Sequence, residues 1–462
     1  MSKETHFLGV CMTSDNLVLE KVLRYGARVA LVGMGKTNLG LLRFFAQWRR
    51  DLVITMRDRV AFACPTDLPF LSPVKTVVGD GYLCDLTEEV LFLAPTVRVD
   101  SEPIQRAIRL GASVCSDVSC FLENTKSVCF GVTGSDGKST TVSLSQAILE
   151  EGNVLSRVGG NIGKVLLPYL ALERSGDCTV VELSSFQLQL PVSNIQRGLI
   201  TNLTPNHLDF HSSLEEYYNA KLSLLFSAKE PVLGCDDEEI VCRCVSLSPY
   251  VSYSMGERYD RRAEHIYTVR EGVVFLDGVA YLSLSGFSHR GRTFLKNVVA
   301  SLALTHGYHT PESAKRAISF FRPLAHRREF VCEENGVLYY NCSADSTPSR
   351  TVETLSTFSS PVLLVMGGRS KGVDYSILCD GLRERVKYVL LCGENSEEIA
   401  VAIAPSGVAY EILHSLSDAV GRAKALCVVG DTVVFSPGST SFDSYKNFEE
   451  RGEAFSLLVK RK

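Results

Sequence analysis

The chain has 462 residues, which is enough for about three domains at roughly 150 residues each. Hydrophobic residues make up 45% of it and charged residues 22%, as in ordinary globular domains, so the composition excludes a disordered or fibrous protein. The chain contains 48 Lys and Arg residues and 52 Asp and Glu residues, so its net charge is −4. This balance lacks the basic excess that nucleic-acid binding needs, so we predict no nucleic-acid partner.

The 15 cysteines are odd in number and scattered from Cys11 to Cys427 without paired short spacings. They predict mostly buried thiols of a reducing cytoplasm rather than a disulfide framework or a zinc site. The first sixteen residues lack a basic end followed by an apolar core and a cleavage site, and no stretch approaches the ~20 apolar residues of a membrane span. We therefore expect a cytoplasmic protein without a membrane partner.

Short β-branched and apolar runs alternate with helical patterns along the chain, which is typical of βαβ units and parallel sheets. The predicted strands lie within 27–33, 126–134, 178–185, 197–203, 361–368, 387–393 and 431–438. Three zones each begin with a strand and a glycine turn, GMGKTN, GSDGKST and GGRSKG. The fold class is thus α/β, with predicted domains 1–122, 123–323 and 324–462. Residues 251–290 predict a small antiparallel sheet within the middle domain.

The first turn, GMGKTN, matches a dinucleotide-binding turn poorly. Its third glycine is replaced by Asn38, and no acidic residue ends the following run LVITMR. Arg57, at the end of that run, suits a phosphate better.

The second turn lies in KSVCFGVTGSDGKSTT, residues 126–141, between an apolar strand and a helix that ends at Gly152. Glycines let backbone N–H groups converge on phosphate oxygens at a helix N-terminus. Lys138 can reach the β and γ oxygens, and the Ser139 hydroxyl can join a magnesium shell. Five residues rather than four separate Gly131 from Gly137, so this is a variant phosphate loop. The alternative is an ordinary strand–turn–helix connection.

Two candidate metal ligands follow strands of the middle domain. Glu182 follows the run CTVV, and a carboxylate at the carboxyl end of a buried strand suits magnesium. His207 lies just past the strand RGLITNL, where a histidine is either a ligand or an ordinary polar loop residue.

Lys221 lies on the apolar face of a predicted helix. The segment SSLEEYYNAKLSLLF begins with the capping box of Ser213 and Glu216. Its apolar stripe is Leu214, Tyr217, Tyr218, Leu222 and Leu225, and position 221 falls on it. The lysine either extends its amine to solvent or is buried with a lowered pKa. A neutral buried amine could add carbon dioxide and become a carbamate, an oxygen ligand for magnesium.

Together these motifs resemble the Mur ligase family, and within it the MurD type. The matching segments are GVTGSDGKST, GGNIG, VELSSFQL, TNLTPNHLD, EYYNAKLSL, LAHRREF, VMGGRSKGVDYS and SPGSTSFDSYKNFEERG. The resemblance is strong over 126–230 and 320–462. It implies an N-terminal Rossmann-like domain for the UDP end of the substrate, a central P-loop ATPase-like domain, and a C-terminal Rossmann-like domain for the amino acid.

The resemblance also implies the chemistry: ATP-dependent addition of D-glutamate to UDP-N-acetylmuramoyl-L-alanine through an acyl phosphate, with two Mg²⁺ ions, by an enzyme expected to be a monomer. It implies catalytic roles for Lys138, His207 and a carbamylated Lys221, the last in place of a solvent-extended lysine. The implied metal ligands are Ser139, Glu182, His207 and Lys221. The implied ATP-binding residues are Gly134, Ser135, Asp136, Gly137, Lys138, Ser139, Thr140, Asn297 and Arg327. The implied UDP-substrate residues are Gly33, Gly35, Thr37, Arg57 and Asn161, and the implied D-glutamate residues are Lys371, Ser441 and Phe448.

Two segments depart from the family pattern. Residues 341–346 read NCSADS where MurD-type ligases carry Asn-Asp-Ser-Lys-Ala-Thr, so Cys342 and Ala344 replace an acid and a lysine. Asp345 is a candidate replacement for the missing carboxylate. Thr293-Phe294 replaces the family's His-Asn ahead of the adenine-contacting asparagine. The alternatives are another Mur or folylpolyglutamate-type ligase, or a nucleotide-binding homologue with impaired catalysis.

Overall fold

The computed structural model describes residues 17–62, 65, 68–205, 210–244, 246–256, 260–290, 292–321, 325–358, 361–370 and 372–461. The chain divides into two compact units, residues 1–284 with 296–320 and residues 285–295 with 321–462. The first unit contains two sheets and the second contains one, so the predicted α/β class with mainly parallel sheets is confirmed. The finer domain boundaries at 122 and 323 stay predictions.

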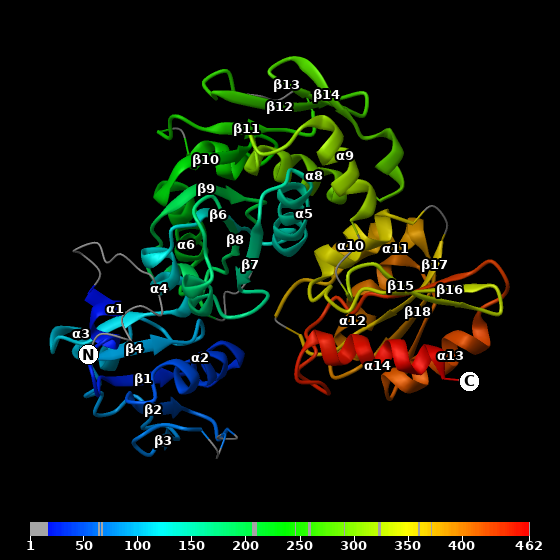
Figure 1. Ribbon diagram of the computed structural model, residues 1–462. Helices are drawn as coiled ribbons and strands as arrows, with labels where there is room; N and C mark the ends of the chain where they lie inside the picture. Colours follow the sequence, from blue (N-terminus) through cyan, green and yellow to red (C-terminus); the bar gives the residue numbers. More distant parts are fainter. Residues whose placement is uncertain are drawn as a thin grey trace. The chain divides into compact units, whose positions relative to one another are not determined.

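The first sheet of unit 1 has five parallel strands in the order β3-β2-β1-β4-β5 (Figure 1). The strands are β1 Arg28–Val32, β2 Val53–Asp58, β3 Lys75–Val78, β4 Val90–Leu93 and β5 Ser113–Cys115. The helices are α1 Leu17–Val22, α2 Lys36–Trp48, α3 Glu102–Arg109 and α4 Asp117–Asn124. The buried strands read as continuous apolar runs because helices cover both faces of a parallel sheet.

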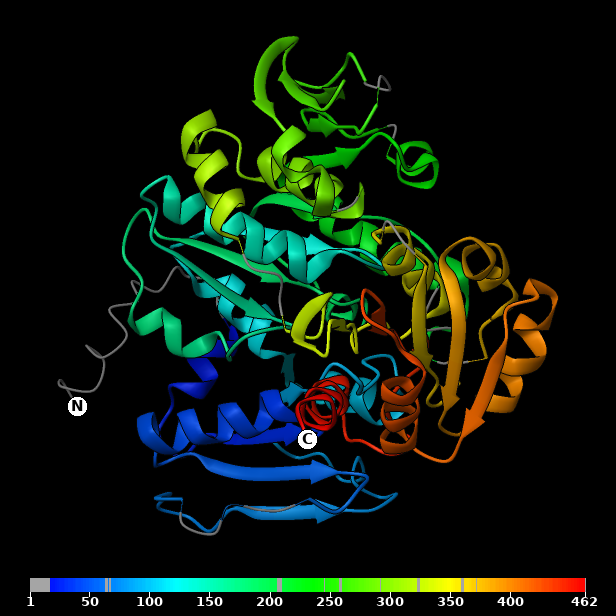
Figure 2. The same cartoon turned by 90° about the vertical axis from the view of Figure 1, so that its right-hand side faces the viewer.

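The second sheet of unit 1 has nine strands in the order β14-β13-β12-β11-β10-β9-β6-β8-β7. The strands are β6 Val128–Thr133, β7 Ser156–Gly160, β8 Cys178–Glu182, β9 Ile195–Ile200, β10 Ala228–Gly234, β11 Val251–Tyr253, β12 His265–Arg270, β13 Val273–Leu276 and β14 Val279–Ser283. The last three pair in antiparallel fashion at the edge of the sheet, as predicted for residues 251–290, and are green in Figure 2.

Between and after these strands the chain forms the helices α5 Lys138–Glu151, α6 Leu214–Ser227, α7 Glu238–Arg243, α8 Arg292–Leu304 and α9 Pro311–Phe320, with the short 3₁₀ turns η1 Leu167–Ala171, η2 Gln187–Gln189 and η3 Ser285–Arg290. Helix α5 ends at Gly152, as its sequence predicts. In α6 the Ser213 Oγ accepts from Glu216 N at 3.1 Å, but the Glu216 carboxylate accepts from Ser212 N instead of Ser213 N. Half of the predicted capping box is therefore present.

Unit 2 has a six-stranded sheet in the order β15-β16-β20-β17-β18-β19, parallel except for the β15–β16 pair. The strands are β15 Glu329–Glu334, β16 Val337–Asn341, β17 Val362–Met366, β18 Val386–Cys392, β19 Tyr410–Leu413 and β20 Thr432–Phe435. The helices are α10 Pro348–Ser356, α11 Cys379–Arg385, α12 Ser396–Ile403, α13 Leu416–Leu426 and α14 Phe448–Lys460, with η4 Ser376–Leu378 and η5 Ala404–Ser406. Strand β20 lies between β16 and β17, so the loops after these three strands meet at one edge.

Eight of the thirteen cysteines in the described residues are buried, which agrees with the prediction of mostly buried thiols. None of the helices in the described part of the chain has the length and apolarity needed to cross a lipid bilayer.

Candidate functional site

The glycine turn at the end of β6 has the geometry of a phosphate-binding loop. Gly134 and Gly137 have φ of +144° and +78°, values that favour glycine. A side chain at Gly134 would clash with Thr201 Oγ1. Lys138, the first residue of α5, donates from Nζ to the Gly134 and Ser135 carbonyls at 2.6 and 2.9 Å. The predicted strand, turn and helix are thus all in place.

Residues after β9 hold this loop. The Asn202 side-chain oxygen accepts from Ser135 N at 3.1 Å and from Asp136 N at 2.9 Å. The Ser135 hydroxyl hydrogen-bonds to the Thr204 carbonyl and to the Tyr217 hydroxyl, at 2.8 and 2.9 Å. The hydroxyl of Ser135, a predicted ATP-binding residue, is therefore used within the protein. Sequence reasoning missed Asn202, because an asparagine after a strand is an ordinary turn residue.

Lys221 is buried in α6, with 2% of its surface exposed. Its Nζ donates to the Gly134 carbonyl at 2.8 Å and lies 4.7 Å from the centroid of the Tyr217 ring. Burial lowers the pKa of Lys221 well below its ordinary value and the nearby Lys138 lowers it further, while Asp136 and Glu182 oppose this shift. The solvent-extended alternative is therefore wrong for this lysine. Its amine lies at the phosphate loop.

Glu182 ends β8, where it pairs in register with Val132 of β6 and Gly160 of β7. Only 1% of its surface is exposed. Its Oε1 accepts from Asn161 Nδ2 at 2.8 Å, and its Oε2 has no hydrogen-bond partner in the described part of the chain. A buried, unpaired carboxylate oxygen is costly unless a proton or a cation satisfies it. Carboxylate and hydroxyl oxygens are ligands that magnesium prefers, so Glu182 fits a magnesium site.

His207 and Lys371 lie outside the described residues. Among those that are described, no three His, Cys, Asp or Glu side chains gather as metal ligands. A second histidine of the same segment, His211, is 3% exposed, and its Nε2 lies 3.0 Å from Ser185 Oγ. Burial lowers the pKa of His211, so the ring favours the neutral form. His207 directly follows the strand and its turn, so it was the only histidine of this segment that the sequence predicted as a ligand.

Asn297, a predicted nucleotide-binding residue, lies next to the loop. A Cβ on Gly137 would lie 2.7 Å from its Oδ1, so only glycine allows this approach. One turn later in α8, Ser301 donates to the Thr141 carbonyl at 3.1 Å, which fixes α8 against α5.

The first glycine turn follows β1. Gly33 has φ +82° and Gly35 caps α2, while the Asn38 amide donates to the Val32, Gly33 and Phe92 carbonyls. The expectation that no acidic residue ends the next strand is wrong. Strand β2 continues to Asp58 because it pairs with β3 up to Val78, and the Asp58 carboxylate accepts from Met34 N in the turn at 2.5 Å.

Arg57 is buried and forms an ion pair with Glu88 at 3.0 Å. Its remaining N–H groups donate to the Tyr82, Cys84 and Asp85 carbonyls. The guanidinium thus has its donors satisfied within the protein, and a phosphate contact would need to displace them. Its predicted phosphate role stays untested.

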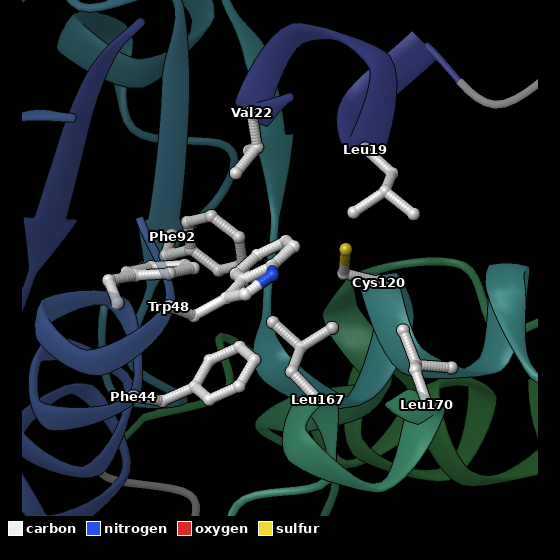
Figure 3. A pocket seen from close by; sticks show the side chains of 9 residues that line it. Leu19, Val22, Phe44, Trp48, Phe92, Cys120, Leu167 and Leu170 are labelled. Carbon is white, nitrogen blue, oxygen red and sulfur yellow. The ribbon is translucent and has the colours of Figure 1, made fainter. Parts of the chain in front are cut away.

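Thr37, another predicted substrate residue, borders a small pocket that the loops after β4 and β5 share with the segment after β8. Its lining includes Thr37, Ala94, Ser116, Asp117, Phe186 and Gln187. A second small pocket lies among α1, α2, α4 and η1 (Figure 3). Its nine lining residues are aliphatic or aromatic apart from Cys120, so it offers few groups to orient a polar substrate.

In unit 2, the predicted D-glutamate residues Ser441 and Phe448 both follow β20. Ser441 is buried and its carbonyl accepts from Tyr445 N at 2.8 Å. Phe448 begins α14, and its carbonyl accepts from Ser343 Oγ at 2.8 Å. Thr440 pairs with Arg369 of the loop after β17. The structure therefore brings together the loops after β16, β17 and β20.

The altered segment 341–346 lies at this same edge. Cys342 is buried in an apolar cluster, and Ala344 N donates to the His326 carbonyl at 3.0 Å. Asp345 Oδ2 accepts from Thr354 Oγ1 and Ser436 Oγ, both at 2.7 Å, and burial raises the pKa of this carboxyl. Arg327, a predicted nucleotide residue, lies between His326 and Arg328, which have φ of +64° and +50°.

Comparison with known proteins agrees with this arrangement. The model of the Mur ligase middle domain matches residues 132–305, and that of the Mur ligase glutamate ligase domain matches residues 326–438. A UDP-N-acetylmuramoylalanine–D-glutamate ligase of Ruminiclostridium cellulolyticum is 34% identical and covers 94% of this chain and 96% of its own. The ligase of the same name from Symbiobacterium thermophilum is 33% identical, with coverage of 94% and 97%.

Among solved structures, MurF ligase of Thermotoga maritima in complex with ADP has a TM-score of 0.58 at 17% identity, with 97% of this chain and 99% of that chain covered. The UDP-N-acetylmuramate–alanine ligase MurC of the same organism also has a TM-score of 0.58, at 15% identity, with 93% and 98% covered. These two likenesses concern the fold. The relatives named UDP-N-acetylmuramoylalanine–D-glutamate ligase, which align over nearly its whole length, and the two matching domain models show that this chain belongs to the Mur ligase family.

Proposed function

We propose that this protein is an ATP-dependent amide ligase that joins D-glutamate to UDP-N-acetylmuramoyl-L-alanine in cytoplasmic peptidoglycan precursor synthesis. The observation that carries the proposal is the phosphate loop itself. The Gly134 carbonyl accepts from both Lys138 and Lys221, and Glu182 presents an unpartnered buried oxygen on the neighbouring strand. The names of the relatives support the choice of substrates.

The reaction proceeds through an activated acid. The alanyl carboxylate attacks the γ-phosphorus of ATP, which forms an acyl phosphate and releases ADP. The amine of D-glutamate then attacks the acyl carbon, and the tetrahedral oxyanion collapses to the amide, expels phosphate and releases the amine proton. Phosphoryl transfer depends on in-line positioning and charge neutralisation, and Lys138 supplies a positive charge at the loop.

ATP would bind with its phosphates on the loop of residues 134–140. The backbone N–H groups at the start of α5 and the Ser139 hydroxyl would bind the phosphates, and Asn297 lies beside Gly137. Arg327 of unit 2 is the further nucleotide contact that the family resemblance implies.

Two magnesium ions would be held by Ser139, Glu182, His207 and a carbamylated Lys221. When bound, the ions neutralise the charge that develops on the transferred phosphoryl group. Lys221 suits carbamylation because its buried amine favours the neutral form, which adds carbon dioxide with loss of a proton.

The two remaining substrates would occupy the glycine turn of the first sheet and the loops of unit 2. Gly33, Gly35 and Thr37 would face the UDP end, and Asn161 would contact the muramyl-alanine portion. Lys371, Ser441 and Phe448 would surround D-glutamate. Arg57 is left out of this set because Glu88 and three carbonyls occupy its donors.

The test is a ligation assay that varies the amino acid. Protein with ATP, magnesium and UDP-N-acetylmuramoyl-L-alanine should release phosphate with D-glutamate. Equal release with L-lysine or meso-diaminopimelate would favour another member of the family. Binding of ATP and of the UDP-sugar without turnover would favour an impaired homologue, which the loss of an acid and a lysine at Cys342 and Ala344 motivates.

A further inference from the structure

Arg451, in the second turn of α14, is a buried cation that the site described above does not use. Only 3% of its surface is exposed. No carboxylate of the described residues lies within ion-pair distance of its guanidinium, and the acidic groups that influence it, Asp443 first, act from farther away. Burial lowers the pKa of Arg451 to about 10, so the group stays charged at neutral pH. A buried charge without an ion-pair partner is unfavourable unless hydrogen bonds and other contacts compensate its lost hydration, and here the Arg451 Cζ also lies over the Phe435 ring, 5.9 Å from its centroid.

The guanidinium connects two loops of the sheet edge. Its Nε and Nη2 donate to the Ser343 hydroxyl and carbonyl, at 3.1 and 2.9 Å, and its Nη1 donates to the Ser439 carbonyl at 3.0 Å. These bonds account for three of its five N–H donors. The loop after β17 also comes close, because a Cβ on Gly368 would lie 3.0 Å from Nη1.

These loops follow β16, β20 and β17, which are neighbours in the sheet. Ligands of open α/β sheets bind outside the carboxyl ends of such strands. Ser343 in turn donates to the Phe448 carbonyl, and Ser439 is two residues from Ser441. Arg451 therefore fixes the backbone on which both described D-glutamate candidates lie.

We propose that Arg451 is a positioning and specificity residue of the amino-acid site, an inference that rests on the proposed function. Its charge favours a dicarboxylate amino acid over one with a neutral side chain. The Arg451 side chain is buried and does not contact the substrate. Its charge attracts the side-chain carboxylate of the amino acid from a distance, and its hydrogen bonds fix the loops that bind the amino acid. Charges interact strongly in a poorly solvated environment, so a buried cation that has no carboxylate within ion-pair distance among the described residues lowers the energy of a carboxylate side chain bound at the nearby loops. The class of substrate selected is an amino acid with an anionic side chain.

The experiment compares Arg451→Met, Arg451→Gln and Arg451→Lys in the full chain. Steady-state kinetics give the KM for D-glutamate and the ratio of kcat/KM between D-glutamate and D-glutamine. We expect the neutral variants to raise the KM for D-glutamate by roughly tenfold or more and to reduce the ratio by a similar factor. Arg451→Lys should raise the KM for D-glutamate but keep the ratio. The positive charge remains, whereas a lysine cannot donate to both Ser343 and Ser439 as the guanidinium does. ATP/ADP exchange without D-glutamate should stay within about twofold of the unsubstituted protein in all three.

Arg422→Met is the matched control, since Arg422 is an exposed arginine of the same unit that pairs with Glu411. An unchanged KM and an unchanged kcat/KM ratio in the neutral variants would overturn the inference. An equal loss of ATP/ADP exchange and of kcat/KM for both amino acids would also overturn it, because such a loss indicates a structural role. If the neutral variants do not fold, loss of the D-glutamate preference in Arg451→Lys overturns it. Absence of any D-glutamate product with the unsubstituted protein would count against the proposed function instead.

Discussion

Lys138 and Lys221 share one acceptor: the Nζ of each donates to the carbonyl oxygen of Gly134, at 2.6 and 2.8 Å. They lie on different helices, 83 positions apart by their numbering, and β6 and β9 bring them together. Two ammonium groups on one carbonyl repel each other, and the buried one gives up its proton more readily. The phosphate loop therefore has one charged lysine and one suited to the neutral form.

This relationship predicts that Lys221 is essential. Lys221→Ala should reduce turnover by roughly 10³-fold or more, because the carbamate ligand cannot form. Removal of bicarbonate and carbon dioxide should lower the activity of the unsubstituted protein, and added bicarbonate should restore it. The measurement is phosphate release in degassed and bicarbonate-supplemented buffer. Lys229→Ala, at an exposed position just after α6, is the control, and full activity of Lys221→Ala would remove the carbamate proposal.

The contact between Asn161 Nδ2 and Glu182 Oε1 predicts a role for Asn161 in metal binding. The bond fixes one carboxylate oxygen and leaves Oε2 for a cation. Asn161→Ala should weaken the binding of a divalent ion by roughly 10- to 100-fold, as loss of an outer hydrogen bond to a metal ligand does. Paramagnetic titration with Mn²⁺ and ATP measures this without turnover. Gln146→Ala, which removes a side-chain bond to Glu150 within α5, should bind normally, and equal binding by all three proteins would contradict the prediction.

We predict that the affinity for ATP depends on Asn202, which lies beside the phosphate loop. Asn202→Ala removes the acceptor of Ser135 N and Asp136 N, so the loop loses part of its preorganisation. We expect the Kd for a fluorescent ATP analogue to rise by about five- to tenfold, the effect of one to two ordinary hydrogen bonds. Gln196→Ala, which removes a side-chain bond between β9 and Glu230 of β10, should leave the Kd unchanged. A similar rise in both variants would indicate a general loss of stability.

Asp117 predicts a pH dependence of stability. Its carboxylate accepts from Leu166 N and Leu167 N, at 2.7 and 3.0 Å, and burial raises its pKa from 3.8 to about 6. The folded state binds the Asp117 proton more tightly than the unfolded state does. The protonated carboxyl therefore makes its full contribution to the free energy of unfolding below pH 4, and this contribution is lost as the pH rises through 6. Between pH 5 and 7.5 the loss is about 1 kcal/mol.

Asp117→Asn cannot titrate and should remove this dependence. Unfolding midpoints in urea at pH 5 and pH 7.5 give the comparison. The difference in unfolding free energy between the two proteins should shift in favour of the variant by about 1 kcal/mol at the higher pH. Parallel pH profiles would show that the carboxyl titrates normally in the folded protein.

The sequence alone determined the regular elements and the chemistry of the phosphate loop. Strands β6 and β8 are largely apolar runs that end at Thr133 and Glu182, and Gly152 ends α5, so local patterns suffice for them. The segments GVTGSDGKST and VELSSFQL also pointed to the family that the relatives confirm.

Contacts between distant segments decided the rest. Whether Lys221 is buried depends on how α6 packs against the loop, which helical periodicity does not contain. Asp58 ends β2 only because β3 pairs with it, and Arg57 is satisfied by Glu88, 31 residues away. Arg451 lies beneath three loops only because β20 lies between β16 and β17. Contacts between side chains far apart in the chain depend on the order of strands in a sheet. Local sequence patterns do not determine that order, because it is set by pairing between distant segments.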